Sequence, residues 1–408
     1  MLNVRVQKML LGGGIQQLFT IVAMPIIANI YGTAAMGIFA EQLSLGVLIG
    51  AFLSLKVEVK LPLLGDKRTR FELVNAATQF NLLCCMAVLG AFYLFDSVLF
   101  LPALIIGSLV NLLSISSYQA IASDRFGTIA LSKAIIPIMF VSSAFGFSLL
   151  LPEIGGETVA MAYIFGLLAS TAIFRPKFLS YRFFSVKKLF NIFVKNKDNS
   201  VFTSTSIVFD LLKDFLIISG VGIYFSAEIA GIYFLATKIF IAPATLLASS
   251  ISQVMYKDLS ELISKRLSLT SYLRSKLALS LALGMVIIFS TFIVVNYFGH
   301  IFLAADWIKI QDLALSMMII VSCIYCMTIL SILVFVLNLQ KRNVLFTFCY
   351  FLVSLLPYAA GIISGVDLVH ILEWQSSILV PYSGLYIFWI FLRVADYEKV
   401  TVTYSTKN

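Results

Sequence analysis

Twelve long apolar stretches, separated by short polar segments, take up most of this chain. Each stretch is long enough, as a helix rising about 1.5 Å per residue, to cross a hydrocarbon layer of about 30 Å. The stretches are residues 9–30, 37–55, 73–95, 99–118, 129–151, 158–174, 201–224, 229–249, 273–298, 310–337, 343–365 and 374–392. They predict an all-α polytopic membrane protein with about twelve transmembrane helices.

Lysine and arginine residues gather in every second gap between these stretches. Of the 29 basic residues, 26 lie in seven regions, which are the two ends of the chain and five alternate loops. Loops rich in basic residues stay on the cytoplasmic side of a membrane. The pattern therefore predicts a multi-pass protein of the inner or plasma membrane with both termini in the cytoplasm.

The composition excludes a soluble domain and gives no sign of a metal or cofactor. Hydrophobic residues make up 60% of the chain and charged residues 12%, which is too little polar surface to cover a soluble fold. The net charge of +9 is spread over loops beside span ends, so we attribute it to topology and anionic lipid headgroups rather than to nucleic acid. All five cysteines lie in predicted spans, and no histidine is spaced to complete a zinc site with them.

The chain divides into two halves that resemble each other. A basic loop at 175–200 separates a predicted N-terminal lobe of six helices, 1–174, from a C-terminal lobe of six helices, 201–392, and a cytoplasmic tail follows at 393–408. YGTAAMGIFA at 31–40 aligns without gaps to FSAEIAGIYF at 225–234, and both segments lie at the outer turn before the second span of a half. Six spans in each half give parallel repeats, which predict a transporter whose two lobes rock against each other.

Four segments carry a resemblance to a known family. They are LGGGIQQLF at 11–19, MPIIANIYGTAAMGIFA at 24–40, KVEVKLPLLGDK at 56–67 and GIYFLATKIFIAPATLLASSISQVMYKDL at 231–259. In order and spacing they resemble the O-antigen and polysaccharide flippases of the multidrug/oligosaccharidyl-lipid/polysaccharide exporter superfamily. The resemblance spans nearly the whole chain, although no single motif is diagnostic.

The resemblance implies a fold, a substrate, a location and partners. Two six-helix lobes would surround a central cavity that opens alternately to each face of the bacterial cytoplasmic membrane. The substrate would be an oligosaccharide repeat unit on undecaprenyl diphosphate, carried to the outer leaflet for assembly of O-antigen or another surface polysaccharide. Membrane lipids, a polysaccharide polymerase and a chain-length regulator would be its partners.

Charged residues inside membrane spans are rare and costly, and they are therefore functional candidates. Span 201–224 carries Asp210, Lys213 and Asp214 on one helix face, and span 229–249 carries Lys238 at a similar depth. In one interpretation the lysines neutralise the aspartates and hold the two spans together. In the other, Lys213 and Lys238 bind the diphosphate of the substrate while Asp210 or Asp214 takes up a proton.

Polar side chains in the first lobe are the remaining candidates for substrate binding. Gln16, Gln17, Glu41 and Gln42 could hydrogen-bond sugar hydroxyls, although the amides could equally pair between helices and Glu41 could reach water. Lys133, near the inner end of its span, could receive the diphosphate at the cavity entrance, or it could simply obey the charge rule for cytoplasmic loops.

Three other kinds of protein compete with this interpretation. A multidrug antiporter of the same superfamily would use buried acids to bind a cation, whereas the intramembrane charges here are balanced. A lipid II flippase usually has fourteen spans, for which 408 residues leave no room. A polysaccharide polymerase, the one enzyme considered, usually carries arginines in a large outer loop, and the predicted outer loops contain none. No phosphate-binding loop for a nucleotide or other enzyme motif is present, so we expect a transporter and not an enzyme.

Overall fold

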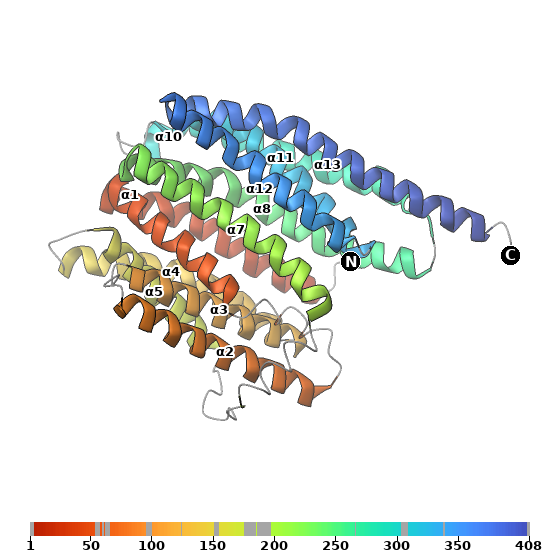
Figure 1. Cartoon of the computed structure of the whole chain (residues 1–408), viewed down its shortest axis with the longest axis horizontal. Helices are drawn as coiled ribbons and strands as arrows, with labels where there is room; N and C mark the ends of the chain where they lie inside the picture. The colour runs from red at the N-terminus through yellow and green to blue at the C-terminus, as the bar shows by residue number, and fades with distance from the viewer. Residues whose placement is uncertain are drawn as a thin grey trace. The chain divides into compact units, whose positions relative to one another are not determined.

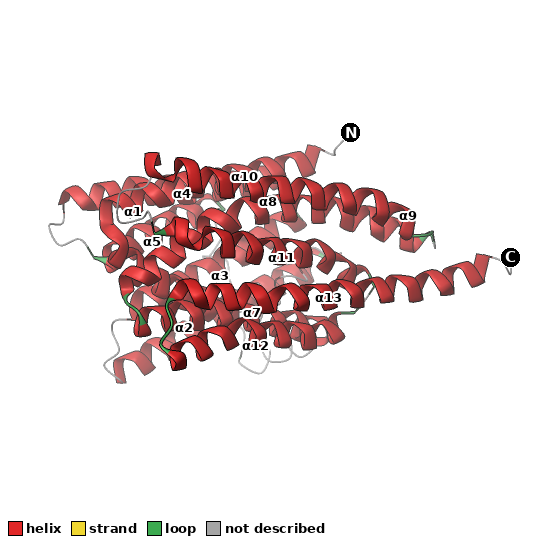
Figure 2. Ribbon diagram, turned by 90° about the horizontal axis from the view of Figure 1, so that it is seen from above, coloured by secondary structure: helices red, strands yellow, loops and turns green. Residues whose placement is uncertain are grey.

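The structure is a computed structural model in which the described residues are almost entirely helical and include no strand (Figure 2). The described residues are 4–53, 58, 61, 66–94, 100–123, 125–150, 155–174, 185, 197–265, 267–302, 309–337 and 339–405. In α1 the side chains are described from Val22 onward. Most of the predicted linker at 175–200 lies outside these ranges.

The chain forms two compact units, Met1–Leu235 and Ala236–Asn408. Unit 1 contains α1 (Val4–Phe52), α2 (Lys67–Leu94), α3 (Leu101–Ala122), α4 (Phe126–Leu150), α5 (Gly156–Ile173), α7 (Lys197–Tyr224) and the first turns of α8 (Ala227–Ser264) (Figure 1). Unit 2 contains the rest of α8, α9 (Thr270–Tyr272), the π-helical turn η4 (Leu273–Leu277), α10 (Ala278–Phe302), α11 (Ile310–Val336), α12 (Gln340–Ser364) and α13 (Leu368–Ser405).

These helices confirm the predicted fold class of an all-α multi-pass membrane protein. Within the described part of the chain, nine helices are long and apolar enough to cross a membrane. The helix α1 contains the first two predicted spans. Its backbone leaves helical geometry between them at Gly32, where φ is 80° and ψ is 172°. Large apolar side chains also point away from the protein, since Ile363 is 86% exposed and Leu150 is 77% exposed. Lipid tails are the solvent that suits such surfaces.

In unit 1 the second part of α1 packs closely on α3 through small residues. A methyl group built on Gly50 would lie 2.7 Å from the carbonyl oxygen of Gly107, and one on Gly46 would lie 2.7 Å from that of Ala103. Both distances are shorter than any real side chain allows. Glycine therefore lets these two backbones approach each other, as is common between helices in membranes.

Polar contacts fix the other helices of unit 1 to one another. The Tyr31 hydroxyl donates to the carbonyl oxygen of Ala144 at 2.6 Å, which ties the turn of α1 to α4. The hydroxyls of Ser132 and Ser170 lie 3.0 Å apart, and that of Ser170 also donates to the Ser132 carbonyl oxygen at 2.9 Å. These buried bonds link α4 to α5 at a depth where no water could replace them.

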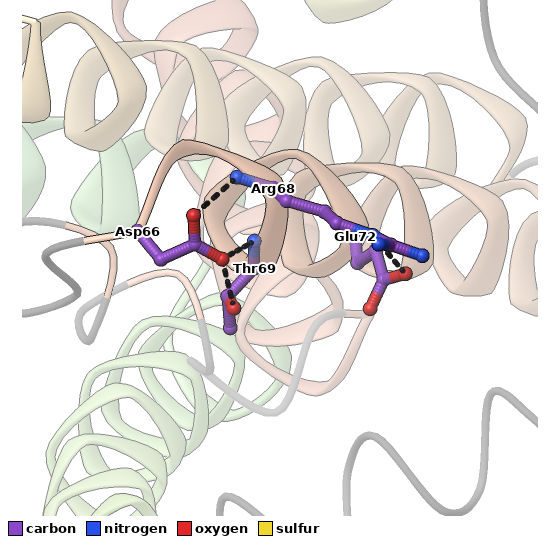
Figure 3. Close-up of polar contacts among 4 residues, drawn as sticks. All are labelled: Asp66, Arg68, Thr69 and Glu72. Atoms are coloured by element: carbon purple, nitrogen blue, oxygen red, sulfur yellow. Dashed lines mark hydrogen bonds and ion pairs between the residues drawn. The ribbon is translucent and has the colours of Figure 1, made fainter.

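Asp66 caps the beginning of α2 (Figure 3). Its carboxylate accepts the Thr69 hydroxyl at 2.7 Å and the backbone N–H groups of Thr69 and Arg68 at 2.9 and 3.2 Å. Two of these donors are N–H groups of the first turn, which have no partner within the helix. The Thr69 hydroxyl, followed by the two backbone N–H groups, holds the pKa of Asp66 below its ordinary value. Arg68 lies 3.9 Å from Glu72 one turn further on.

In unit 2 the last helix reaches back to the loop that follows α8. One carboxylate oxygen of Glu398 in α13 accepts the backbone N–H groups of Leu269 and Thr270 at 2.5 and 2.9 Å. The hydroxyls of Ser268 and Thr270 donate to the same oxygen. Glu398 therefore caps the beginning of α9 from a residue about 130 positions further along the chain.

Candidate functional site

The centre of the candidate site is a cluster of three charges on α7. The Lys213 ammonium lies 2.8 Å from Asp210 Oδ1 and 3.2 Å from Asp214 Oδ1. The residue Lys213 is 7% exposed, whereas the side chains of Asp210 and Asp214 are 55% and 56% exposed. Asp210 is three residues before Lys213 and four before Asp214, and these spacings place the groups within about one turn of the helix. We call Asp210, Lys213 and Asp214 the α7 triad.

The α7 triad combines a covered cation with two partly open anions. With all three groups ionised it carries one net negative charge. The ammonium is stable at this depth because two carboxylates lie within hydrogen-bonding reach. An anionic ligand of Lys213 would compete with the two carboxylates for its ammonium, while a cation or proton could reach the carboxylates directly. The structure thus brings Lys213 together with both aspartates of α7, and it leaves the choice between the two sequence-based interpretations open.

Lys238 lies in α8 within unit 2 and is half-buried. The α7 triad lies in unit 1. Pairing of Lys238 with the aspartates of α7, and its role toward the substrate, remain predictions.

The two candidates in the second part of α1 differ in their surroundings. Glu41 is half-buried, and its backbone carbonyl oxygen accepts the Ser44 hydroxyl at 3.0 Å. Gln42 is 8% exposed, and its side-chain oxygen Oε1 has no hydrogen-bond partner among the described residues. A buried amide oxygen without a donor is costly, so Gln42 has capacity to accept a hydrogen bond from a ligand hydroxyl or a water molecule. The side chains of Gln16 and Gln17 lie outside the described residues.

Lys133 lies in α4, seven positions after the helix begins at Phe126. It is half-buried, and it makes no hydrogen bond or ion pair with any residue that the structure describes. The neighbouring residue Ser132 is fully buried against α5. Lys133 is thus a positive charge on a rigid helix, without a carboxylate of its own.

A buried carboxylate was not among the sequence-based candidates. Glu58 is 0% exposed, and its Oε1 accepts the Ser114 hydroxyl of α3 at 3.0 Å. One turn earlier on the same face of α3 is Asn111, which is also 0% exposed and has neither amide atom hydrogen-bonded within the described structure. Glu58 stands in the basic segment KVEVKLP, which looks like an ordinary cytoplasmic loop. The local sequence holds no signal of its burial, because the partner is 56 positions away.

The helices and their apolar surfaces place the chain in the class of multi-pass membrane proteins. Its fold is similar to solved structures of membrane transporters, among them MATE family transporters of the MOP superfamily. No family model matches the chain, and no curated protein does.

Solved structures with this fold match nearly the whole chain. The lipid II flippase MurJ in an inward closed conformation matches with a TM-score of 0.67 and 14% identity, over 96% of this chain and 90% of its own. A multidrug resistance transporter of the MATE family in an inward-facing conformation matches with a TM-score of 0.62 and 12% identity, over 98% and 96% of the two chains. An outward-facing structure of a MATE family transporter gives 0.58 and 14%, over 97% and 96%. At such identities the likeness establishes a shared fold.

Proposed function

We propose that this protein is a flippase that carries undecaprenyl diphosphate-linked oligosaccharide repeat units across the bacterial cytoplasmic membrane by alternating access. The observation that carries the proposal is Lys213, a buried lysine in α7, which contains the predicted span 201–224, in a fold that a lipid II flippase shares. A diphosphate diester has about two negative charges, and an ammonium group attracts it strongly where water is excluded. The resemblance of the four sequence segments to polysaccharide flippases supports the same substrate class.

The α7 triad suggests how binding and release would alternate. The incoming diphosphate would replace Asp210 or Asp214 on the Lys213 ammonium, and the displaced carboxylate would take up a proton. On release the carboxylate would lose that proton and return to Lys213. Gln42 would accept a hydrogen bond from a sugar hydroxyl, and Lys133 would receive the diphosphate near the predicted cytoplasmic side. In this scheme the charged side chains bind the diphosphate and the proton, and the protein needs no nucleotide.

A cation antiporter is the second candidate, and one observation favours it. The triad has two carboxylates for one lysine, and the carboxylates are its exposed members. Such a group attracts a cationic compound, and the fold is shared with multidrug resistance transporters of the MATE family.

Deletion of the gene in its native host separates the candidates. A flippase deletion should abolish the surface polymer and leave single lipid-linked repeat units on the inner face of the membrane. Normal surface glycan together with increased sensitivity to cationic drugs would contradict the flippase and favour the antiporter. Lipid-linked units that reach the outer face but stay unpolymerised would contradict both and favour a polymerase.

A further inference from the structure

The two repeat-related segments recognised in the sequence touch each other in unit 1. A methyl group built on Gly37 in α1 would overlap the carbonyl oxygen of Ala227 and lie 3.1 Å from the backbone nitrogen of Gly231. One built on Gly231 in α8 would overlap the carbonyl oxygen of Thr33 and lie 3.0 Å from the backbone nitrogen of Gly37. The two backbones therefore meet at van der Waals distance, with no side chain between them. We call this contact the glycine crossing.

The glycine crossing is reciprocal in the repeat alignment. Gly37 aligns with Gly231, and Thr33 aligns with Ala227. Gly37 therefore contacts Ala227, and Gly231 contacts Thr33, so the two contacts are equivalent in the repeat alignment. The helical segments also start at equivalent positions, because the break in α1 is at Gly32 and α8 begins directly after Ser226. Equivalent surfaces meet on the axis of a symmetric pair, so a reciprocal contact between aligned residues is the pattern expected on such an axis.

An aromatic contact continues the crossing two residues further along α1 and three further along α8. The rings of Phe39 and Phe234 meet edge to face, with centroids 5.9 Å apart and an angle of 89°. Phe39 also contacts Phe140 of α4 and Tyr163 of α5, with both centroid distances at 5.6 Å. Phe39 and Phe234 are 0% and 2% exposed. Two successive layers, backbone and then aromatic, thus leave no space between α1 and α8 at this end.

We propose that the glycine crossing, with the Phe39 and Phe234 rings beneath it, is the gate that closes the predicted outer side of the transport route. The inference rests on the proposed transport function, because a gate needs a route. In parallel repeats the route follows the axis between them, and a contact on that axis must separate before a substrate can leave. The described contacts of this gate are made by backbone atoms and aromatic rings, and no side chain lies between the two backbones at Gly37 and Gly231.

The experiment measures access to the buried side of the gate and requires no substrate. The five native cysteines are replaced by serine, and Ala40, which is 0% exposed, is replaced by cysteine. A membrane-impermeant maleimide is added from the predicted outer side of spheroplasts. Gly37→Val should prop the crossing open and raise the labelling rate at position 40 at least tenfold. Gly146→Val in α4 is the matched control and should change nothing, because a methyl group there meets no atom within 4 Å.

The equivalence of the two glycines supplies a second criterion. Gly231→Val should raise labelling as much as Gly37→Val, and the double variant should add little, since one bulky residue already separates the crossing. Unchanged labelling in a Gly37→Val protein that is monodisperse and present at the normal level would overturn the proposal. So would equal labelling in the Gly146→Val control.

A bridging experiment tests the gate even if the valine variants fail to fold. Thr33→Cys and Ala227→Cys are introduced together, both at half-buried positions, and are joined by a short, cleavable bifunctional thiol reagent. Bridging should stop surface glycan export, and reduction should restore it. Full export by bridged protein would overturn the gate. If the protein without these two substitutions supports no glycan export at all, the proposed substrate is wrong, and the labelling experiment still decides on the gate.

Discussion

Lys213 holds together two carboxylates that would otherwise repel each other across one turn of α7. Its ammonium is covered, whereas the carboxylates are more than half exposed, so the lysine and the aspartates of the triad have different access to a ligand. This difference lets mutagenesis separate a structural ion pair from a binding site. If the triad is only structural, a variant in which all three residues are neutral should still function. If the triad binds a charged substrate, that variant should lose binding.

We expect Lys213→Ala to reduce both the amount of protein and its export activity. Removing the lysine leaves Asp210 and Asp214 without their shared counter-ion inside a membrane span. The loss of stability should be on the order of 1 to 3 kcal/mol, less than for a fully buried pair because both carboxylates are partly exposed. Thermal unfolding of purified protein and quantification of surface glycan would measure the two effects.

The neutral triple variant, Asp210→Asn, Lys213→Gln and Asp214→Asn, should recover the protein level but not the export. It removes the unbalanced charges and the affinity for a diphosphate at the same time. Normal export by this variant would assign the α7 triad a structural role only.

Lys238→Ala tests the second predicted lysine independently. If Lys238 binds substrate, export should fall at least tenfold while the protein level stays normal. Lys265→Ala is the matched control, since Lys265 is exposed at the end of α8 and should tolerate the change. Full export by Lys238→Ala at normal protein level would exclude a role of Lys238 in diphosphate binding.

At the scale of elements, the ends of helices contain the most specific polar contacts of the structure. Asp66 caps α2 from the residue just before it, and Glu398 caps α9 from the last helix. The first cap has a visible sequence signal, since aspartate precedes a helical run, whereas the second cannot be read locally because it depends on how α13 returns to α9.

We expect the contribution of Asp66 to stability to depend on pH. Its pKa in the folded protein is lowered, so the contribution is present above the pKa of the unfolded chain and is lost as pH falls through the folded value. Asn can cap a helix but does not titrate, which makes Asp66→Asn the comparison variant. The difference in melting temperature between wild type and Asp66→Asn should be largest near neutral pH and shrink toward about pH 3. A difference that is constant across this range would contradict the prediction.

Truncation tests the Glu398 cap. A chain that ends after Tyr397 loses the carboxylate, while a chain that ends after Lys399 keeps it. The shorter chain should be less stable by about 1 kcal/mol, the usual cost of losing a helix cap. Equal melting temperatures of the two truncated proteins would mean that the contact with α9 contributes nothing.

At the scale of the whole molecule, the all-α membrane fold could be predicted from the sequence because apolar spans are local patterns. The sequence predicts about twelve spans, and nine helices in the described part of the chain are long and apolar enough to cross a membrane. Apolar length predicts a span without knowledge of its neighbours, and the alignment of 31–40 with 225–234 located the two helix starts that the structure places at equivalent positions. The triad could be predicted for the same reason, since Lys213 and Asp214 follow Asp210 by three and four residues on one helix. Glu58 and the orphan oxygen of Gln42 could not be predicted, because burial depends on residues far away in the sequence.

The predicted orientation of the whole chain has its own test. In the cysteine-free background, a cysteine at Gly155 should react with an impermeant maleimide in intact spheroplasts, because this position lies in a predicted outer loop. A cysteine at Ser185, which is exposed in the basic loop, should react only after permeabilisation. The opposite result at both positions would reverse the orientation and move the glycine crossing to the cytoplasmic side.

The backbone angles of the turn at Gly32 restrict which residue types can occupy this position. Its φ of 80° and ψ of 172° fall in a region that is essentially restricted to glycine, and asparagine, which accepts the left-handed helical region, does not fit there either. A methyl group at this position would meet no atom within 4 Å, so an L-alanine would be rejected by its own backbone and not by any neighbour. A D-alanine would satisfy the same angles without strain. The reversal between the first two spans thus depends on the one natural residue type whose α-carbon is not chiral.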